Sequence, residues 1–316
     1  MRDDSPWITI AIPSYNRAHL LHRAVESVVG QTEDHWELWI VDDASSDDAW
    51  TIAEKASRSD TRIHATRHPR NLGLAQNFSY AAQCGIAPYV LLLAADDFLD
   101  SRFLQHVRAV VERDPHVALI CARRIHQRSN GSRRYFDTPL VGRYSEGEVV
   151  ARALRSGNLF GLYSSVVVQR DALIEIGGIR QDNTWAGDFE AFTKISARHP
   201  VYFEPRALAY QNVDRSTQTF AMVRDATLVS FEFATLERLL EDPAVRNSVG
   251  NKDVLRAWNR IVAIQWALRL YSLATSPFNP KGVSPPLPPK YVPRTSYWAV
   301  LLTLVRLLWY RARLTY

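Results

Sequence analysis

Two adjacent carboxylates, Asp96 and Asp97, end an apolar run that starts at Tyr89 and reads YVLLLAADD. Adjacent carboxylates repel each other, and a divalent cation, which prefers hard oxygen ligands, turns that repulsion into attraction. Aspartate is also common where strands end, because its side chain bonds nearby backbone groups, so a plain surface turn is the alternative for this segment. A second acidic stretch, VDDASSDD at 41–48, follows a second apolar run.

The segments that carry these acids belong to an alternation of strand-like and helix-like patterns. The patterns predict strands at 7–15, 36–43, 62–69, 89–97 and 117–125, and helices at 17–31, 45–59, 71–85 and 100–115. This rhythm predicts an α/β fold with a Rossmann-like, mainly parallel sheet flanked by helices. Ligands of such sheets bind beyond the carboxyl ends of the strands. Both acidic stretches should therefore share one rim with IPSYNR, which follows the first strand, and this favours a cation or nucleotide site.

The chain lacks the backbone loops that usually cradle phosphates. No GxGxxG follows the first predicted strand, and no Gly-rich loop ends in GK[ST]. Phosphates at the rim would therefore need a metal ion and arginines to hold them. A nucleotidyltransferase also places carboxylates and metal on an α/β sheet, but it usually needs a Gly- and Lys/Arg-rich loop that PSYNRAHLL does not provide.

A third acid, Asp188, stands where a helix begins in the segment GDFEAFTKIS. The helix macrodipole favours an acid at that position, so a purely structural role is one interpretation. Apolar residues within 191–196 predict the buried face of this helix. Helical patterns fill most of 222–275, and a Pro-rich segment at 276–293 should be extended and fairly stiff.

Basic residues are in excess, with a net charge of +5, which is compatible with nucleic acid, an anionic membrane or a phosphorylated substrate as partner. The apolar run from Trp298 to Trp309 is too short to span a bilayer, which takes about 20 apolar residues. Its tryptophans, leucines and arginines predict an amphipathic helix at 294–316 lying in the membrane interface. Docking of this helix onto the protein's own core, or onto a second subunit of a homo-oligomer, is the alternative.

The compartment is predicted from the cysteines and the first residues. Cys84 and Cys121 lie in apolar surroundings and do not make a disulfide framework, which is typical of a reduced cytoplasmic protein. The opening residues, MRDDSPW, do not resemble a signal peptide. We expect a cytoplasmic protein that is peripheral at the inner face of the membrane and binds no nucleic acid.

Six motifs resemble those of the inverting, non-processive glycosyltransferases of family 2, which have the GT-A fold. In chain order they are ITIAIPSYNR, WELWIVDDASSDD, NLGLAQNFSYAA, LLLAADD, SSVVVQRDALIEIGG and GDFEAFTKIS. The resemblance implies a nucleotide-diphosphate-sugar donor, a divalent metal (Mn²⁺ or Mg²⁺), and transfer of a single sugar to an acceptor hydroxyl with inversion. The QxxRW motif of processive synthases is absent.

The resemblance also implies roles for individual residues. Asp188 matches the catalytic base, and Asp96 matches the last acid of the DxD motif, which binds the metal with help from Asp97. The motifs carry over a set of donor-binding positions, which are Pro13, Ser14, Tyr15, Arg17, Asp42, Asp43 and Asn71, together with Asp96 and Asp97. Two positions depart from the family pattern, because Ala94 replaces the first acid of the DxD motif and Gly187 replaces the acid before the base.

These observations predict a GT-A catalytic domain at 1–220, a helical extension at 221–275, the connector at 276–293 and the amphipathic helix at 294–316. We expect a lipid-linked or cell-surface glycan precursor as acceptor, because the tail and the arginines at 123, 124, 133 and 134 suit anionic lipid or a lipid diphosphate. A soluble small-molecule or protein acceptor is one alternative. A catalytically inactive nucleotide- or carbohydrate-binding module is the other, and Ala94 slightly favours it.

Overall fold

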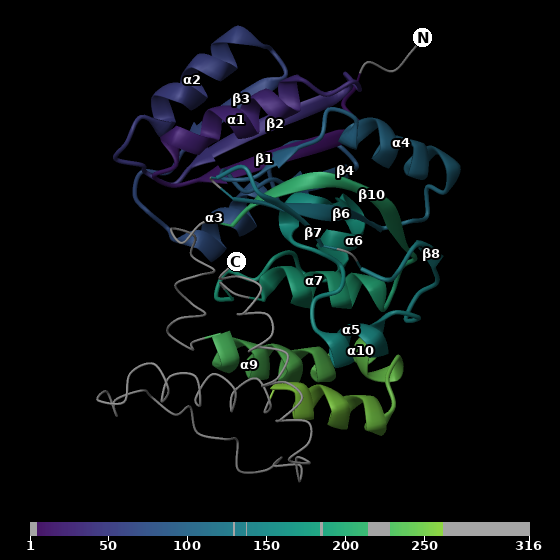
Figure 1. Cartoon of the computed structure of the whole chain (residues 1–316). Coiled ribbons are helices and arrows are strands. Elements are labelled where there is room, and N and C mark those ends of the chain that lie inside the picture. The colour runs from purple at the N-terminus through teal and green to yellow at the C-terminus, as the bar shows by residue number, and fades with distance from the viewer. Residues whose placement is uncertain (1–4, 129, 137, 184–185, 214–227, 262–316) are drawn as a thin grey trace, which may run out of the picture. The chain divides into compact units, whose positions relative to one another are not determined.

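The computed structural model describes residues 5–128, 130–136, 138–183, 186–213 and 228–261 (Figure 1). The chain forms two compact units, the first from 1–149 and 158–215 and the second from 150–157 and 216–316. The predicted connector, the predicted amphipathic helix and the predicted domain boundary at 220 lie outside the described residues. Within the described ranges, no helix is long and apolar enough to cross a bilayer.

A ten-stranded sheet organises the first unit (Figure 1). Its strands follow the order β3-β2-β1-β4-β9-β6-β10-β5, with β7 beside β6 and β8 beside β10. The strands are β1 (Ile8–Ser14), β2 (Trp36–Asp42), β3 (Ile63–Arg67), β4 (Tyr89–Leu92), β5 (Phe98–Leu99), β6 (Leu119–Gln127), β7 (Arg133–Phe136), β8 (Gly142–Tyr144), β9 (Val166–Gln169) and β10 (Val201–Asn212).

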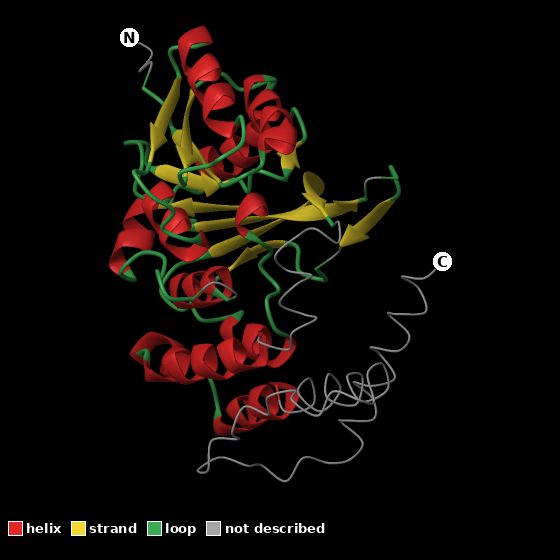
Figure 2. Ribbon diagram, turned by 90° about the vertical axis from the view of Figure 1, so that its left-hand side faces the viewer, coloured by secondary structure: helices red, strands yellow, loops and turns green. Residues whose placement is uncertain are grey.

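Helices cover both faces of this sheet (Figures 1 and 2). One face carries α1 (Ala18–Val29), α2 (Ala49–Ser59) and α4 (Phe103–Arg113), and the other carries α3 (Leu74–Ala81), α6 (Arg170–Glu175) and α7 (Gly187–Ser196). A 3₁₀ turn, η1 (Tyr163–Ser165), precedes β9. The described part of the second unit is helical, with α5 (Val150–Ser156), α9 (Leu228–Glu241), α10 (Pro243–Asn247) and residues 251–261.

The strand β1 lies in the middle of the parallel half of the sheet, and all seven of its residues are buried. Its apolar sequence, ITIAIPS, is typical of a parallel strand with helices on both faces. It pairs in parallel with β2, where Ser14 lies opposite Asp42, and with β4, where Ala11 lies opposite Leu92. The carboxyl ends of these three strands therefore meet at one edge, as the sequence pattern predicts.

The helix α1 shows how the apolar spacing produces this packing. Leu21, Val25 and Val28 recur at helical spacing and are buried against the sheet together with Ala24, whereas Val29 is exposed. Burial of each Leu or Val side chain contributes roughly 1.5–3 kcal/mol to folding. The helix predicted at 17–31 thus forms over Ala18–Val29.

The sheet carries more antiparallel pairing than the alternation predicts. The strand predicted at 89–97 forms only over Tyr89–Leu92, and the one predicted at 117–125 forms as β6, but β9 lies between β4 and β6 and runs antiparallel to both. The α/β fold class with helices on both faces is confirmed, while the parallel arrangement is limited to β3-β2-β1-β4 and to β6-β10.

The long strand β10 is absent from the sequence prediction, and Pro205 explains why. Proline lacks the N–H group that a sheet ladder needs, so it argues against a strand. The pairing of β10 with β6 shifts register between Glu204 and Ala207, and this irregularity accommodates the proline. Beyond it, β10 continues to Asn212 and brings that residue to the rim described below.

Candidate active site

The loops after β1 and β2 are joined by hydrogen bonds at the carboxyl edge of the sheet. The Asn16 backbone N–H donates to the Ser45 hydroxyl over 2.9 Å, and the Ser46 N–H donates to the Asn16 side chain over 2.8 Å. Both loops contain a non-glycine residue with positive φ, at Asn16 (50°) and Ala44 (58°). Such backbone strain, on the order of 1–3 kcal/mol per residue, clusters at functional sites.

The two aspartates after β2 are buried and have different partners. Oδ2 of Asp42 forms an ion pair with the Arg67 guanidinium and accepts a hydrogen bond from the Ser45 N–H, each over 3.1 Å, while its buried Oδ1 has no hydrogen-bond partner among the described residues. Asp43 accepts from the backbone N–H groups of Leu72 (2.7 Å) and Gly73 (3.0 Å). A buried acceptor without a partner is costly, so Oδ1 of Asp42 marks a place where a ligand N–H group could bind.

The residues at the end of β1 border the same place. Pro13 and Ser14 are buried, and the Ser14 hydroxyl has no hydrogen-bond partner in the part of the chain that the structure describes. Tyr15 presents an exposed ring, and the predicted residue Asn71 is exposed beside the backbone that Asp43 holds. Ser14 lies opposite Asp42 in the sheet, so the two buried oxygens that have no partner among the described residues belong to paired positions of β1 and β2. The structure thus brings together most of the residues predicted to bind the nucleoside.

The carboxylates of Asp96 and Asp97 lie in different environments. Asp96 is partly exposed, and burial raises its pKa while the charges of Arg17 and Arg23 lower it. Asp97 is buried and accepts bonds from the Ser164 hydroxyl (2.6 Å) and the Asn212 N–H (2.9 Å). Burial and the neighbouring Asp96 charge raise the pKa of Asp97 to about 7. Both oxygens of Asp97 are therefore used inside the protein.

This arrangement fits a divalent cation held mainly by a ligand's phosphates. No group of three or more His, Cys, Asp or Glu side chains among the described residues can hold a metal ion. Asp96 remains as a partly exposed carboxylate beside Arg17 and Arg23. Mg²⁺ is typically bound by one or two carboxylates, substrate phosphates and water, so a single protein carboxylate suffices for it at a diphosphate site.

Asp188 lies in the first turn of α7, as the sequence predicts, and its side chain is buried. Its Oδ2 accepts from the Asn158 amide over 3.1 Å, and its Oδ1 accepts from the Phe189 N–H over 2.6 Å. Burial raises the pKa of Asp188 to about 7, although these bonds and the Arg124 charge act in the opposite direction. A carboxylate with this pKa can accept a proton near neutral pH.

Arg124 connects the two acidic positions electrostatically. Burial lowers its pKa, while the charges of Asp188 and Asp97 raise it. Its guanidinium also donates to Gln211 over 3.3 Å. Arg124 was predicted to suit anionic lipid or a lipid diphosphate, but its side chain is partly buried and interacts with the charges of Asp188 and Asp97.

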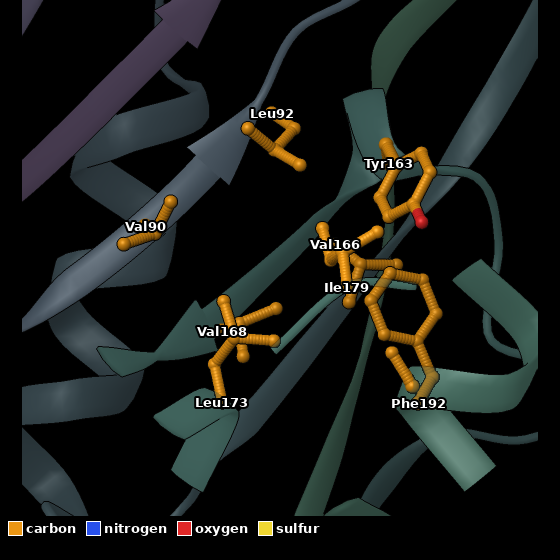
Figure 3. A pocket seen from close by; sticks show the side chains of 9 residues that line it. Val90, Leu92, Tyr163, Val166, Val168, Leu173, Ile179 and Phe192 are labelled. Carbon is orange, nitrogen blue, oxygen red and sulfur yellow. The ribbon is translucent and has the colours of Figure 1, made fainter. Parts of the chain in front are cut away.

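Figure 3 shows a small apolar cavity behind the rim, with Tyr163 and Phe192 among its lining side chains. Its volume of about 10 Å³ is at the lower limit for one water molecule. A larger hollow of about 140 Å³ lies beside the start of α7 and is lined by Gly187, Glu190, Arg180 and Lys194 among others. The small cavity has apolar walls, whereas the larger hollow has polar walls along the face of α7 that carries Gly187, Glu190 and Lys194.

Several residues of this site were not predicted from the sequence, namely Asn158, Tyr163, Ser164 and Asn212. Asn158 and Ser164 lie in SGNLFGLYSS, whose Gly and Ser content indicates a turn but not its contacts. Asn212 acts through its backbone N–H, which leaves no side-chain signal.

The family model described as "Glycosyl transferase family 2" matches residues 9–177, which include β1 to β9 and the acidic rim. The chain belongs to this family. Family membership agrees with the six motifs and with the α/β architecture.

Two curated relatives are similar to this family 2 chain over much of its length. An uncharacterized protein of Mycobacterium tuberculosis, MT1568, is 27% identical over 292 residues, covering 86% of this chain and 91% of the relative. The succinoglycan biosynthesis protein ExoU of Rhizobium meliloti is 26% identical over 220 residues, covering 66% of this chain and 62% of the relative.

Two solved structures share the fold of the family 2 chain. TarS residues 1–349 of S. aureus, in complex with UDP-GlcNAc, gives a TM-score of 0.67 at 14% identity, covering 85% of this chain and 75% of that chain. The mannosyltransferase PcManGT of Pyrobaculum calidifontis, in complex with GDP-Man and Mn²⁺, gives 0.61 at 18% identity, covering 98% and 83%. At these identities the comparison shows the GT-A fold.

Proposed function

We propose that this family 2 glycosyltransferase moves one sugar from a nucleotide-diphosphate sugar to an acceptor hydroxyl with inversion at the anomeric carbon. The observation that carries the proposal is the division of the acids. Asp96 is partly exposed among cations on the rim, while Asp188 is a buried carboxyl on α7 with a pKa of about 7. One acid thus suits a metal and diphosphate, and the other suits proton transfer.

In the proposed reaction, Asp188 accepts the proton of the acceptor hydroxyl. The acceptor oxygen forms a bond to the anomeric carbon while the bond from that carbon to the diphosphate oxygen breaks. The nucleoside diphosphate leaves with the electron pair. Since attack and departure take place on opposite sides of the carbon, a single displacement inverts its configuration.

The donor would bind at the joined loops after β1 and β2. Oδ1 of Asp42 is a buried acceptor without a partner within the described ranges, which suits an N–H group of the base, and Tyr15 offers an exposed ring on which a base can stack. Pro13, Ser14 and Asn71 would complete the nucleoside site, while Asp43 holds the backbone at Leu72 and Gly73.

A divalent cation, Mn²⁺ or Mg²⁺, would be held by Asp96 and would neutralise the charge that develops on the leaving diphosphate. The Mn²⁺ and GDP-Man in the PcManGT complex support this choice. Arg17 and Arg23 lie within electrostatic range of Asp96 and would add positive charge beside the phosphates. Asp97, predicted as a second ligand, would help by fixing the turn that carries Asp96.

The acceptor would be a lipid-linked or cell-surface glycan precursor, in keeping with the succinoglycan relative. The polar hollow along α7, the helix that carries Asp188, is a candidate place for its sugar. Peripheral contact with the inner membrane face would come from residues 294–316, following a catalytic domain at 1–220. A soluble acceptor is the alternative. It predicts that deletion of 293–316 leaves both liposome binding and activity unchanged.

The test begins with a thermal-shift screen of UDP, GDP and dTDP with and without Mn²⁺. The corresponding sugar nucleotides are then assayed with lipid-linked and soluble glycans, and NMR of the product gives the anomeric configuration. We expect metal-dependent transfer with inversion, abolished in Asp96→Ala and Asp188→Asn. Retention would overturn the mechanism, and nucleotide binding without any transfer or donor hydrolysis would favour the inactive binding module.

A further inference from the structure

The turn η1 contacts both positions at which the chain departs from its family's motifs. These positions are Ala94, in place of the first acid of the DxD motif, and Gly187, in place of the acid before Asp188. The contacts come from successive residues, Ser164 to Ala94 and Tyr163 to Gly187. One short turn thus meets the metal-binding turn and the base helix at once.

Ser164 holds the turn that carries Asp96. Its buried hydroxyl accepts from the Ala94 N–H over 3.0 Å and donates to Oδ2 of Asp97 over 2.6 Å. The bonds fix the residues on both sides of Asp96, because the Asp97 N–H also donates to the Ala94 carbonyl over 2.9 Å.

Tyr163 fixes the start of α7. Its hydroxyl oxygen lies 2.9 Å from the position that a Cβ atom on residue 187 would take, which is closer than real Cβ atoms approach other atoms. Gly187 is therefore the residue that fits. The Tyr163 ring packs against Phe192 of α7, with ring centroids 5.8 Å apart, and against Phe78 of α3 at 5.1 Å (Figure 3 shows Tyr163 and Phe192). Burial raises the pKa of Tyr163, and the charge of Asp188 raises it further.

We propose that Tyr163 and Ser164 are positioning residues that hold the Asp96 turn and the Asp188 helix at a fixed separation. The proposal rests on the proposed function, in which this separation sets the distance between the leaving diphosphate and the base. Neighbouring residues of one tight turn move together, so a shift at either contact is transmitted to the other. The turn itself is closed by the Ser165 N–H and hydroxyl, which donate to the Leu162 carbonyl over 2.9 and 3.1 Å.

The first arm of the test compares Ser164→Ala with Ser165→Ala. Each variant lacks one buried serine hydroxyl of the same turn. Among the described contacts, the Ser165 hydroxyl donates only to the Leu162 carbonyl, inside the turn. Mn²⁺ binding in the presence of UDP or GDP is measured by electron paramagnetic resonance, which needs no turnover. We expect about 10-fold weaker Mn²⁺ binding in Ser164→Ala, a typical effect of losing a residue that orients a metal ligand, and a change under twofold in Ser165→Ala. Equal effects in the two variants would overturn the role of Ser164.

The second arm tests the contact with the base helix by suppression. Gly187→Ala should lower kcat by at least about tenfold with little change in the donor KM, because displacement of a reacting group by about 1 Å has large effects. Adding Tyr163→Phe removes the hydroxyl that the new Cβ meets and should recover most of the lost kcat. Failure of the double variant to recover, with circular dichroism and melting temperature like those of Gly187→Ala, would overturn the role of Tyr163.

The outcomes separate this proposal from the proposed function. If the wild-type protein binds Mn²⁺ with a nucleoside diphosphate but transfers no sugar, the proposed function fails, and the Mn²⁺ arm still decides the role of Ser164. If sugar is transferred, but Ser164→Ala behaves like Ser165→Ala and Tyr163→Phe does not restore the activity of Gly187→Ala, the proposed function stands and the positioning role is wrong.

Discussion

The side-chain amide of Asn158 donates a 3.1 Å hydrogen bond to Oδ2 of Asp188 and a 2.8 Å bond to the Gly161 carbonyl. The asparagine therefore orients the base of the proposed reaction and stabilises its ionised form. A bond to the charged form of an acid lowers its pKa, so Asn158 opposes the effect of burial on Asp188.

Replacing Asn158 by alanine should move the acid limb of the pH–rate profile to higher pH. Without the bond, the pKa of Asp188 rises above its value of about 7, and a base must be ionised to accept a proton. To check this, kcat is measured at about ten pH values between about 5 and 9. Asn247→Ala, at an exposed position in α10, is the control and should leave the limb unchanged. An acid limb that stays at the same pH or moves to lower pH in Asn158→Ala would contradict this role of Asn158.

Replacing Asp188 by asparagine should reduce kcat by about 10²–10⁴-fold while raising stability at high pH. The pKa of Asp188 is raised on folding, from an ordinary 3.8 to about 7, so the folded state binds the extra proton between these values. Stability of the wild-type protein therefore falls as the pH rises through this window, by up to about 4 kcal/mol.

The neutral asparagine avoids that loss. Melting temperatures of the wild-type and Asp188→Asn proteins should agree near pH 4 and diverge towards pH 8, with the variant higher. The far-UV spectra provide the control for folding. A variant that is less stable than the wild type at pH 8 would show that the carboxylate contributes favourable contacts that outweigh its burial.

Asp43→Asn should weaken nucleotide binding about tenfold. The Asp43 carboxylate accepts two backbone N–H bonds from Leu72 and Gly73, and one of its oxygens becomes an amide donor in asparagine, so one bond is lost. The loop beside Asn71 would then be less well ordered. The effect is measured by isothermal titration calorimetry, in which UDP or GDP is added to the protein in the presence of Mn²⁺. Asp48→Asn, at an exposed neighbouring position, should bind as the wild type does, and equal losses in both variants would argue against the specific role.

Gly85→Ala should destabilise the protein far more than Gly178→Ala, although both glycines have positive φ, at 73° and 78°. A Cβ at position 85 would lie 2.4 Å from the Glu37 carboxylate and 2.5 Å from the Thr9 hydroxyl, which share a buried 2.7 Å hydrogen bond. The Gly178 position has open space, so that substitution costs only about 1–2 kcal/mol of backbone strain.

Urea denaturation gives the two free energies of unfolding for this comparison. We expect a loss for Gly85→Ala that exceeds the Gly178→Ala loss by about 2 kcal/mol or more, because the buried Glu37 must lose bonds to make room. Equal losses would show that the Glu37 side chain has room to move.

The sequence predicted the parts of the site that depend on local pattern. Asp42, Asp96 and Asp188 each follow an apolar run or begin a helix, and strand and helix periodicity is enough to place such residues at element ends. The meeting of the β1 and β2 ends also follows from parallel pairing alone, as Ser14 and Asp42 show. Family membership added the reaction class.

The remaining features depend on contacts between distant segments. Ser164 and Asp97 are 67 residues apart, and the partner of the second Asp97 oxygen is a backbone group 115 residues away, at Asn212. No periodicity encodes such pairs. Arg124 was predicted to suit anionic lipid because it belongs to a cluster of arginines in the sequence, and its pairing with Gln211 of β10 and its burial depend on contacts between distant segments.

The position of β9 has a consequence for how the chain folds. β4 and β6 are complete once residue 127 has been synthesised, yet the strand that belongs between them ends at residue 169. Until β9 arrives, the facing edges of β4 and β6 have unpaired backbone groups, which can pair wrongly with each other or with another chain. Such late, non-local pairing slows folding and favours aggregation of incomplete chains. Fragments that end before residue 169 should therefore be insoluble, whereas co-expression with a chaperone that binds exposed strands should improve the yield of the full chain.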